Sequence, residues 1–441
     1  MLFERPAAGH RAVILNIELN RQANPDPDEF AELARSAELE VVLTVHAKRD
    51  APQPNTYVGR GKVEEVAGEL KAQEADLLLV NHELNAGQQR NLEKQLHCRV
   101  ITRTELILTI FADRARSHEG QLQVELAQLK HAQTRLVRGW THLDRQKGGI
   151  GLRGAGEKQI ELDQRMLGER IKATEKKLAQ VEKRRGQSRR SRKRRGTPTV
   201  TLVGYTNAGK STLFNRMTQA SVYAEDQLFA TLDPTTRKVD IPGLNDVVLA
   251  DTVGFVSLLP HALVEAFKAT LEEVAQADLL IHVIDVSDPL AEERVAQVRE
   301  VLAEIGADEV PEVVALNKAD LLAEDAVPGT FGGPQSTRVL VSALTGQGID
   351  ELYAAVGSAL GVAAPHEVVL KPGDGKTRAW LYRSGAVLNE ALLEDGSMML
   401  TLQANEFLIE ELANTPQVLL RGRSPPPKIQ GLQAETINGV E

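Results

Sequence analysis

A glycine-rich stretch at 204–211 has the residue types and spacing that bind phosphate. It reads GYTNAGKS, follows the apolar run Thr199–Val203 and precedes the helix-like segment Thr212–Met217. Backbone N–H groups of such a loop curl around phosphate oxygens, and the dipole of the following helix adds to their attraction. Lys210 would neutralise charge on the β- and γ-phosphates, and Ser211 would ligate Mg²⁺. A chance glycine-rich turn is the competing interpretation, and the flanking strand and helix argue against it.

A second motif selects the base. Asn317–Asp320 reads NKAD and directly follows the apolar run Val313–Leu316, at the strand end where open α/β sheets bind ligands. The Asp320 carboxylate can accept two hydrogen bonds, from N1–H and the 2-amino group of guanine. Adenine offers no such donor pair, so the motif favours GTP over ATP. Ser342, Ala343 and Leu344, on the next predicted strand, would support the base through backbone contacts to its 6-oxo group.

Two further segments between these motifs carry metal and γ-phosphate chemistry. The DTVG sequence of Asp251–Gly254 closes the apolar run Val247–Ala250; Asp251 would hold Mg²⁺ through water, and the Gly254 N–H would sense the γ-phosphate. The segment 229–233 reads FATLD, and we predict Thr231 as the switch threonine that completes the Mg²⁺ shell. Thr235 and Thr236 compete for that role, and spacing does not separate them.

The predicted site therefore joins five segments. We assign Lys210, Thr231 and Gly254 to catalysis, and Ser211 and Thr231 to the metal, with Asp251 acting through water. The full predicted guanine-nucleotide pocket is Gly204, Tyr205, Thr206, Asn207, Ala208, Gly209, Lys210, Ser211, Thr212, Phe229, Ala230, Thr231, Leu232, Asp233, Asp251, Thr252, Val253, Gly254, Asn317, Lys318, Ala319, Asp320, Ser342, Ala343 and Leu344.

The elements that position this pocket form an α/β domain over 197–363. Its predicted strands are Thr199–Val203, Asp246–Asp251, Leu279–Asp285, Val313–Asn317 and Arg338–Ser342. After it, 364–420 reads strand, helix, two strands and a last helix, which predicts a small α+β domain. The tail at 421–441 contains three consecutive prolines and few apolar residues, and we expect it to be disordered.

Residues 1–116 predict a further, parallel-sheet α/β domain, because short apolar runs alternate with helical patterns. The predicted strands are Ala12–Ile17, Glu40–Val45, Leu77–Val80 and Val100–Thr102, and the predicted helices are Pro27–Ser36, Val63–Ala72 and Asn85–Leu96. Gly59–Lys62, which reads GRGK, is either a phosphate cradle or a turn that begins a helix. The second interpretation is favoured, because too few residues are present for a P-loop.

Residues 117–196 predict a long antiparallel helical hairpin. Narrow apolar stripes mark one face of each helix: Leu122, Leu126, Leu129 and Leu136 in the first, and Ile160, Leu167, Ile171, Leu178 and Val181 in the second. Between the helices, 148–156 holds five glycines, which permit close backbone approach to another surface. Arg145, Lys147 and Arg153 near this tip are candidate RNA contacts; a mobile connector is the alternative.

Charge and composition limit the partners. The chain has 441 residues, which suggests about three domains, and its single cysteine excludes a disulfide framework. No signal peptide or membrane span is recognisable, so we expect a cytoplasmic protein without stable membrane insertion. Residues 114–195 hold 23 Lys+Arg against 9 Asp+Glu, whereas the whole chain carries −9. Nine of those cations lie in 183–195, which is either a solvated linker or a polyanion-binding element.

Taken together, these motifs resemble the HflX family of translation-factor-related GTPases over essentially the whole chain. The resemblance rests on GYTNAGKST at 204–212, FATLDPTTR at 229–237, DTVGF at 251–255, NKAD at 317–320 and SAL at 342–344. Outside the nucleotide domain it rests on YVGRGK at 57–62 and GLRGAGE at 151–157. The resemblance implies a Mg²⁺-dependent GTPase, binding GTP and GDP, that associates with the large ribosomal subunit and its RNA and splits or rescues stalled ribosomes under stress.

Several alternatives stay open at this point. An RNA-remodelling or ribosome-assembly factor in which GTP gates RNA binding, or a GTPase acting on tRNA or a protein, would also carry these motifs.

Phe255 stands where many GTPases place a glutamine that orients the attacking water. A hydrophobic residue at this position fits the resemblance to the HflX family. We therefore expect slow intrinsic hydrolysis that the ribosome accelerates. Asn207 either binds K⁺ or serves loop geometry. ATP binding by the N-terminal domain is neither supported nor excluded, and a monomer is expected.

Overall fold

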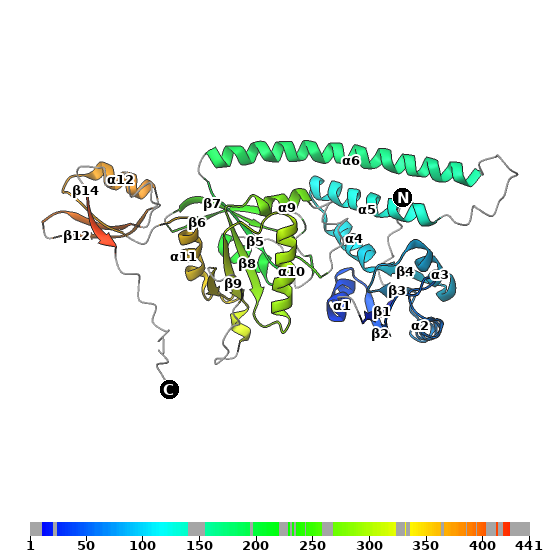
Figure 1. Cartoon of the computed structure of the whole chain (residues 1–441). Coiled ribbons are helices and arrows are strands. Elements are labelled where there is room, and N and C mark those ends of the chain that lie inside the picture. Colours follow the sequence, from blue (N-terminus) through cyan, green and yellow to red (C-terminus); the bar gives the residue numbers. More distant parts are fainter. Residues whose placement is uncertain are drawn as a thin grey trace, which may run out of the picture.

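The computed structural model describes residues 11–20, 24–139, 155–194, 197–219, 228–229, 232, 235–242, 244–257, 268–322, 331, 336–362, 366–384, 386–393, 395–402, 412 and 418–423. Three units that contain sheets lie in a row, and a helical hairpin runs along two of them (Figure 1). The chain is a multidomain α/β protein. No helix in the described ranges is both long and apolar enough to cross a membrane.

The N-terminal unit is the predicted parallel sheet with helices around it. Its strands β1 (Arg11–Leu19), β2 (Glu40–Arg49), β3 (Leu77–Val80) and β4 (Arg99–Thr102) lie in the order β2-β1-β3-β4, all parallel. Its helices are α1 (Pro27–Ser36), α2 (Arg60–Ala72), α3 (Ala86–Leu96) and α4 (Arg103–Arg114). Gly59 precedes the first residue of α2, in agreement with the helix-start interpretation of Gly59–Lys62.

Helix α4 was not predicted. A capping box starts it: the Thr102 hydroxyl accepts from the Glu105 N–H, and the Glu105 carboxylate accepts from the Thr102 N–H. Leu106, Ile107 and Phe111 are almost fully buried, so the helix has no polar face of the kind that periodicity detects. Its burial on several sides is what hid it.

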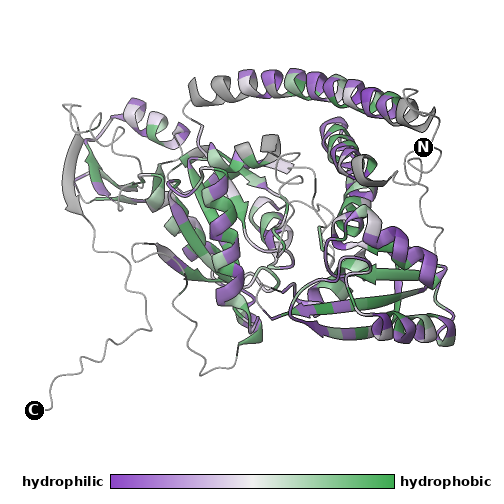
Figure 2. Cartoon of the chain, turned by 45° about the vertical axis from the view of Figure 1, so that its right-hand side comes forward, coloured by the Kyte–Doolittle hydropathy of each residue, from purple (hydrophilic) through white to green (hydrophobic). Residues whose placement is uncertain are grey.

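The hairpin consists of α5 (His118–Gly139) and α6 (Ala155–Arg194). The predicted leucine stripes meet, and one apolar cluster contains Leu122, Leu126, Leu129, Leu167, Ile171 and Leu178, with Leu136 partly buried against it. The basic run continues α6 as far as Arg194. Most of α6 outside this seam is hydrophilic along its length (Figure 2).

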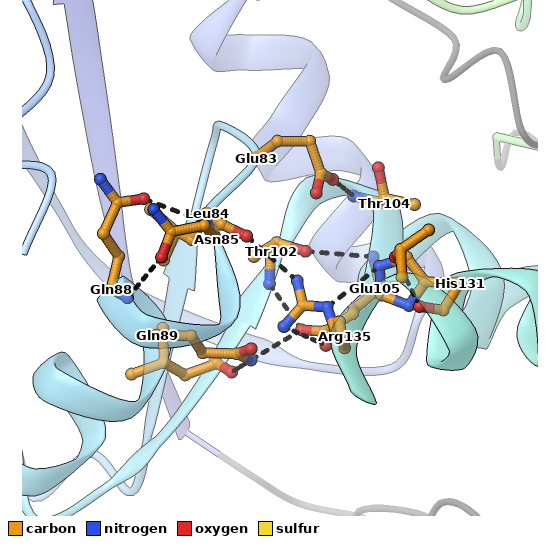
Figure 3. A network of polar contacts seen from close by, with 12 residues as sticks. Glu83, Leu84, Asn85, Gln88, Gln89, Thr102, Thr104, Glu105, His131 and Arg135 are labelled. Atoms are coloured by element: carbon orange, nitrogen blue, oxygen red, sulfur yellow. Dashed lines mark hydrogen bonds and ion pairs between the residues drawn. The ribbon is translucent and has the colours of Figure 1, made fainter. Parts of the chain in front are cut away.

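A polar network fastens α5 to the N-terminal unit (Figure 3). Arg135 of α5 forms a 3.1 Å ion pair with Glu105 of α4, and Gln89 of α3 donates a 3.0 Å hydrogen bond to the same carboxylate. The Arg135 Nε–H also donates to Nε2 of His131, at 3.3 Å. Burial lowers the pKa of His131 to about 4 and raises that of Glu105.

The third unit holds the P-loop on a six-stranded sheet with strand order β10-β9-β8-β5-β7-β6. Its strands are β5 (Thr199–Val203), β6 (Thr235–Ile241), β7 (Leu244–Asp251), β8 (Leu279–Asp285), β9 (Glu312–Asn317) and β10 (Thr337–Leu340). Its helices are α7 (Lys210–Thr218), α9 (Lys268–Ala275), α10 (Ala291–Glu304), the 3₁₀ turn η2 (Ala319–Leu321) and α11 (Ile349–Ala359). Strand β6, antiparallel to β7 at the sheet edge, was missed, and β10 ends at Leu340 rather than at Ser342.

The C-terminal unit is a small antiparallel sheet on the far side of the P-loop unit from β1–β4 (Figure 1). It contains β11 (His366–Leu370), α12 (Gly375–Arg383), β12 (Val387–Leu392), β13 (Met398–Leu402) and β14 (Val418–Arg423), with strand order β12-β13-β11-β14. Because β14 pairs with β11 as far as Arg423, the predicted start of the tail at 421 is wrong. Residues 424–441, and all of the predicted last helix except Leu412, lie outside the described ranges.

Candidate guanine-nucleotide site

The phosphate loop runs from the end of β5 into α7, as its sequence predicts. Gly209 adopts a left-handed backbone with φ of 89°, and a Cβ at this position would collide with the Asn317 amide. Lys210 is only 6% exposed, and its Nζ donates a 2.6 Å hydrogen bond to the Tyr205 carbonyl. The loop therefore holds one buried ammonium group among backbone dipoles.

Burial sets the chemistry of this ammonium group. It lowers the pKa of Lys210 to about 8, although the nearby Asp251 carboxylate opposes the shift. A phosphate placed next to Lys210 would favour the protonated form and raise that pKa. A negatively charged ligand therefore stabilises the protonated form of Lys210, which burial disfavours.

A hydroxyl and a carboxylate meet beside the loop. Ser211 Oγ lies 2.7 Å from Asp251 Oδ2, and Asp251 is fully buried. Hydroxyl and carboxylate oxygens are the ligands that Mg²⁺ prefers, so the donor set fits this ion. Among the described residues, no group of three or more His, Cys, Asp or Glu is arranged to hold a metal.

The remaining predicted metal ligand, Thr231, lies outside the described residues, as do Ala230 and Asp233. The competitors Thr235 and Thr236 begin β6, where Thr235 pairs with Asp251 and Thr236 is exposed. The choice among the three stays a prediction.

The segment after β7 is bound to the phosphate loop by its backbone. The Thr206 N–H donates to the Phe255 carbonyl at 2.8 Å, and the Phe255 N–H donates to the Gly204 carbonyl at 3.2 Å. A Cβ on Gly254 would lie 2.9 Å from Lys210 Nζ and 2.7 Å from Thr206 Cγ2. Only glycine fits there, and its backbone lies beside the lysine that would contact phosphate.

The base-selecting loop is joined to the phosphate loop through Asn317. Its Nδ2 donates to the Ala208 carbonyl at 2.8 Å, and its Oδ1 accepts from the Ala343 N–H at 2.9 Å. The fully buried Ser342 donates a 2.5 Å hydrogen bond to Oδ1 of the exposed Asp320. This bond orients the carboxylate that would accept from guanine.

Other predicted residues have different surroundings. The Thr252 hydroxyl is buried and donates to the Leu202 carbonyl at 2.6 Å. Lys318 pairs with Asp285 at 2.7 Å, and Leu344 is 70% exposed. Phe229 and Leu232 are buried in an apolar cluster of the N-terminal unit. The candidate RNA contacts Arg145, Lys147 and Arg153 lie outside the described residues.

Phe255 is buried inside the P-loop unit, with Leu271 and Val274 in its apolar cluster. Its side chain has no group that could orient a water molecule. Sequence reasoning missed three residues next to this segment: Glu29 and Arg103 of the N-terminal unit, and Ser257. No motif marks them, because the interactions that join them cross from one unit to the other.

A phosphate loop between β5 and α7, an oxygen pair suited to Mg²⁺ and an NKxD loop at the end of β9, two strands away in the same sheet, define a P-loop GTPase. Family models match four consecutive stretches: "GTP-binding GTPase N-terminal" at 25–112, "GTP-binding GTPase Middle Region" at 114–192, "50S ribosome-binding GTPase" at 199–318 and "HflX C-terminal domain" at 333–415. The chain belongs to the HflX family of GTPases.

Relatives agree with this assignment over most of the chain. GTPase HflX of Escherichia coli (strain K12) is 51% identical over 406 residues, which cover 91% of this chain and 95% of that protein. GTPase HflX of Magnetococcus marinus is 48% identical over 377 residues, covering 85% and 86%.

Proposed function

We propose that the GTP-bound protein associates with the large ribosomal subunit and its RNA, and splits or rescues stalled ribosomes under stress. Support comes from the family model that matches 199–318, whose description is a 50S ribosome-binding GTPase. A cytoplasmic monomer suits this role. GTP hydrolysis then ends the association.

The basic end of the hairpin is the observation that carries the proposal. Lys183 and Arg184 are exposed near the end of α6, a helix in which most residues are hydrophilic (Figure 2). The next residue, Arg185, forms ion pairs of 2.9 Å with Glu119 of α5 and 3.2 Å with Glu273 of α9. The run therefore combines exposed cations, suited to RNA phosphates, with one cation that anchors the hairpin to the nucleotide-binding unit. Arg145, Lys147 and Arg153 would extend the RNA contact at the tip.

The pocket residues have defined roles in hydrolysis. Lys210 binds and neutralises phosphate oxygens, and Gly254 contacts the γ-phosphate through its N–H. Ser211 and Thr231, with Asp251 through water, would hold Mg²⁺, which supplies charge neutralisation when bound. Because Phe255 cannot orient water, we propose that the ribosome completes the site by ordering the switch segment around Thr231.

K⁺ is a second proposed ion. The Asn207 Nδ2 donates a 3.3 Å hydrogen bond to Glu32 of α1, and the amide oxygen of Asn207 is the group that would contact K⁺. If K⁺ binds there, turnover falls when Na⁺ replaces it. Equal turnover in the two salts leaves loop geometry as the role of Asn207.

The association is tested by pelleting ribosomal subunits with a non-hydrolysable GTP analogue or with GDP. We expect co-sedimentation with large subunits in the analogue and little in GDP. The pair Lys183→Gln and Arg184→Gln should weaken binding and lower the salt dependence of log Kd by about 1–2 per tenfold change in salt. Lys371→Gln together with Lys376→Gln, at two exposed lysines of the C-terminal unit, is the charge-matched control. Equal pelleting in both nucleotides contradicts the proposal.

Splitting is distinguished from RNA remodelling by light scattering of intact ribosomes. A GTP-dependent fall in scattering supports splitting. Binding to subunits without any fall favours the assembly or remodelling function, in which GTP only gates RNA binding.

A further inference from the structure

A buried polar cluster joins the N-terminal unit to the phosphate loop and to the segment after Gly254. Glu29 of α1 and Arg103 of α4 are each 4% exposed, and Tyr205 and Ser257 are each 6% exposed. The Glu29 carboxylate accepts from the Tyr205 hydroxyl and from Arg103, and at 3.1 Å from the Ser257 hydroxyl. Arg103 donates at 3.0 Å to the Ser257 carbonyl, and the Ser257 N–H donates at 2.6 Å to the Tyr205 hydroxyl oxygen.

These hydrogen bonds form only when the N-terminal unit and the nucleotide-binding unit are docked as they are here. A buried carboxylate or guanidinium that loses its partner is strongly destabilising, so separating the units without admitting water is disfavoured. Tyr205 and Ser257 come from the nucleotide-binding unit, whereas both charges come from the N-terminal unit. The cluster therefore fixes the position of Ser257 relative to Tyr205.

The same two residues bracket the predicted γ-phosphate sensor. Tyr205 is the second residue of the phosphate loop, and Ser257 follows Gly254 by three residues. Between them lie the backbone hydrogen bonds of Phe255 to Gly204 and Thr206, which hold Gly254 next to Lys210. Whatever fixes Tyr205 and Ser257 also fixes the backbone of Gly254.

Apolar contacts also join the N-terminal unit to the predicted switch segment at 229–233. Phe229 stacks edge-on against Phe111 of α4, with ring centroids 4.6 Å apart. Leu232 and Val256 lie in the same buried cluster as Phe30 and Phe111. Residues on both sides of the γ-phosphate position are thus packed into the core of the N-terminal unit.

We propose that Glu29 is a positioning residue for GTP recognition. By binding Tyr205 and Ser257 it holds the Gly254 N–H at the γ-phosphate position before nucleotide arrives, so the N-terminal unit helps the pocket prefer GTP over GDP. A pre-arranged donor avoids the ordering cost that a free segment would add to binding. Linkage also requires the converse: bound GTP strengthens the docking of the N-terminal unit.

The test measures the affinities of the full chain for GDP and for a non-hydrolysable GTP analogue. Glu29→Gln and, separately, Tyr205→Phe should each weaken binding of the analogue about 10-fold and change binding of GDP less than about 2-fold. The double variant should be little worse than either single variant, because both break the same contact. Asp28→Asn, which removes an exposed carboxylate one residue away on the same helix, should change neither affinity.

A merely structural role gives a different result. Equal weakening for both nucleotides, or no change for either, overturns the proposal. Tyr205→Phe keeps the ring and all charges, so it provides the test if Glu29→Gln fails to fold, and Ser257→Ala provides an independent one.

Discussion

At the scale of single residues, guanine selection depends on a carboxylate that a buried hydroxyl orients. Asp320 is exposed, and the 2.5 Å hydrogen bond from Ser342 fixes one of its oxygens. The backbone N–H of the neighbouring Ala343 is bound to Asn317, which also binds the phosphate loop. Base and phosphate recognition are therefore held in one rigid frame.

Asp320→Asn should change the base preference of the pocket from guanine to xanthine. The amide can donate to the 2-oxo group of xanthine, but it cannot accept from both N1–H and the 2-amino group of guanine. We expect GTP affinity to fall at least about 100-fold and xanthosine triphosphate affinity to rise, measured by competition with a fluorescent nucleotide. Asp308→Asn, an exposed aspartate in the loop before β9, is the control. Unchanged selectivity would refute the role of Asp320.

Lys210 should make nucleotide binding depend on pH. Its pKa of about 8 in the protein rises when phosphate binds, so binding takes up protons near pH 8, and affinity falls as pH increases beyond 8. At pH 8 we expect about half a proton per nucleotide, measured by calorimetry in buffers of different ionisation enthalpy. Lys210→Arg, which stays protonated, should lose this uptake. No uptake by the unaltered protein would show that Lys210 is not the titrating group.

At the scale of elements, α4 and α5 join the hairpin to the N-terminal unit through the network of Figure 3. Arg135, Glu105 and Gln89 hold the two helices together by direct polar contacts. His131 lies within this network in neutral form, because burial lowers its pKa. Protonation of His131 is therefore a way to loosen the joint.

Acid should destabilise the protein through His131. Its pKa is about 4 when folded, against an ordinary 6.5, so between these values the unfolded chain binds more protons and stability falls as pH falls. We expect a loss of about 1–2 kcal/mol between pH 7 and pH 5 in urea unfolding, which His131→Gln should largely remove. His118→Gln, at an exposed histidine of the same helix, should keep the loss. The same loss in the His131 variant would contradict this origin.

The sequence predicted those elements whose pattern is local. The phosphate loop, its strand and the NKAD loop are continuous in the chain, and the leucine stripes of α5 and α6 repeat at helical spacing. Helix α4 was missed because it is buried on several sides, and β6 because an edge strand that starts with two threonines and two cations has no apolar run. Glu29, Arg103 and Ser257 were missed because their contact depends on how two units dock.

At the scale of the whole molecule, the nucleotide pocket lies between two structures that can report on it. On one side, the N-terminal unit packs against the segment that contains Phe229 and Leu232 and against the segment that follows Gly254. On the other, Arg185 connects α9 of the nucleotide-binding unit to the hairpin. The hairpin is fastened in turn to the N-terminal unit (Figure 3). A change at Gly254 therefore has a continuous route of packed contacts to the surface proposed to bind RNA.

The most direct test of this account is single-turnover GTP hydrolysis with and without large ribosomal subunits. Because Phe255 offers no group to orient water, hydrolysis by the protein alone should be slow. Large subunits should accelerate it at least about 10-fold, a barrier difference of about 1.4 kcal/mol, by ordering the switch segment around Thr231. Small subunits should not do so. Equal rates with and without large subunits would contradict the account.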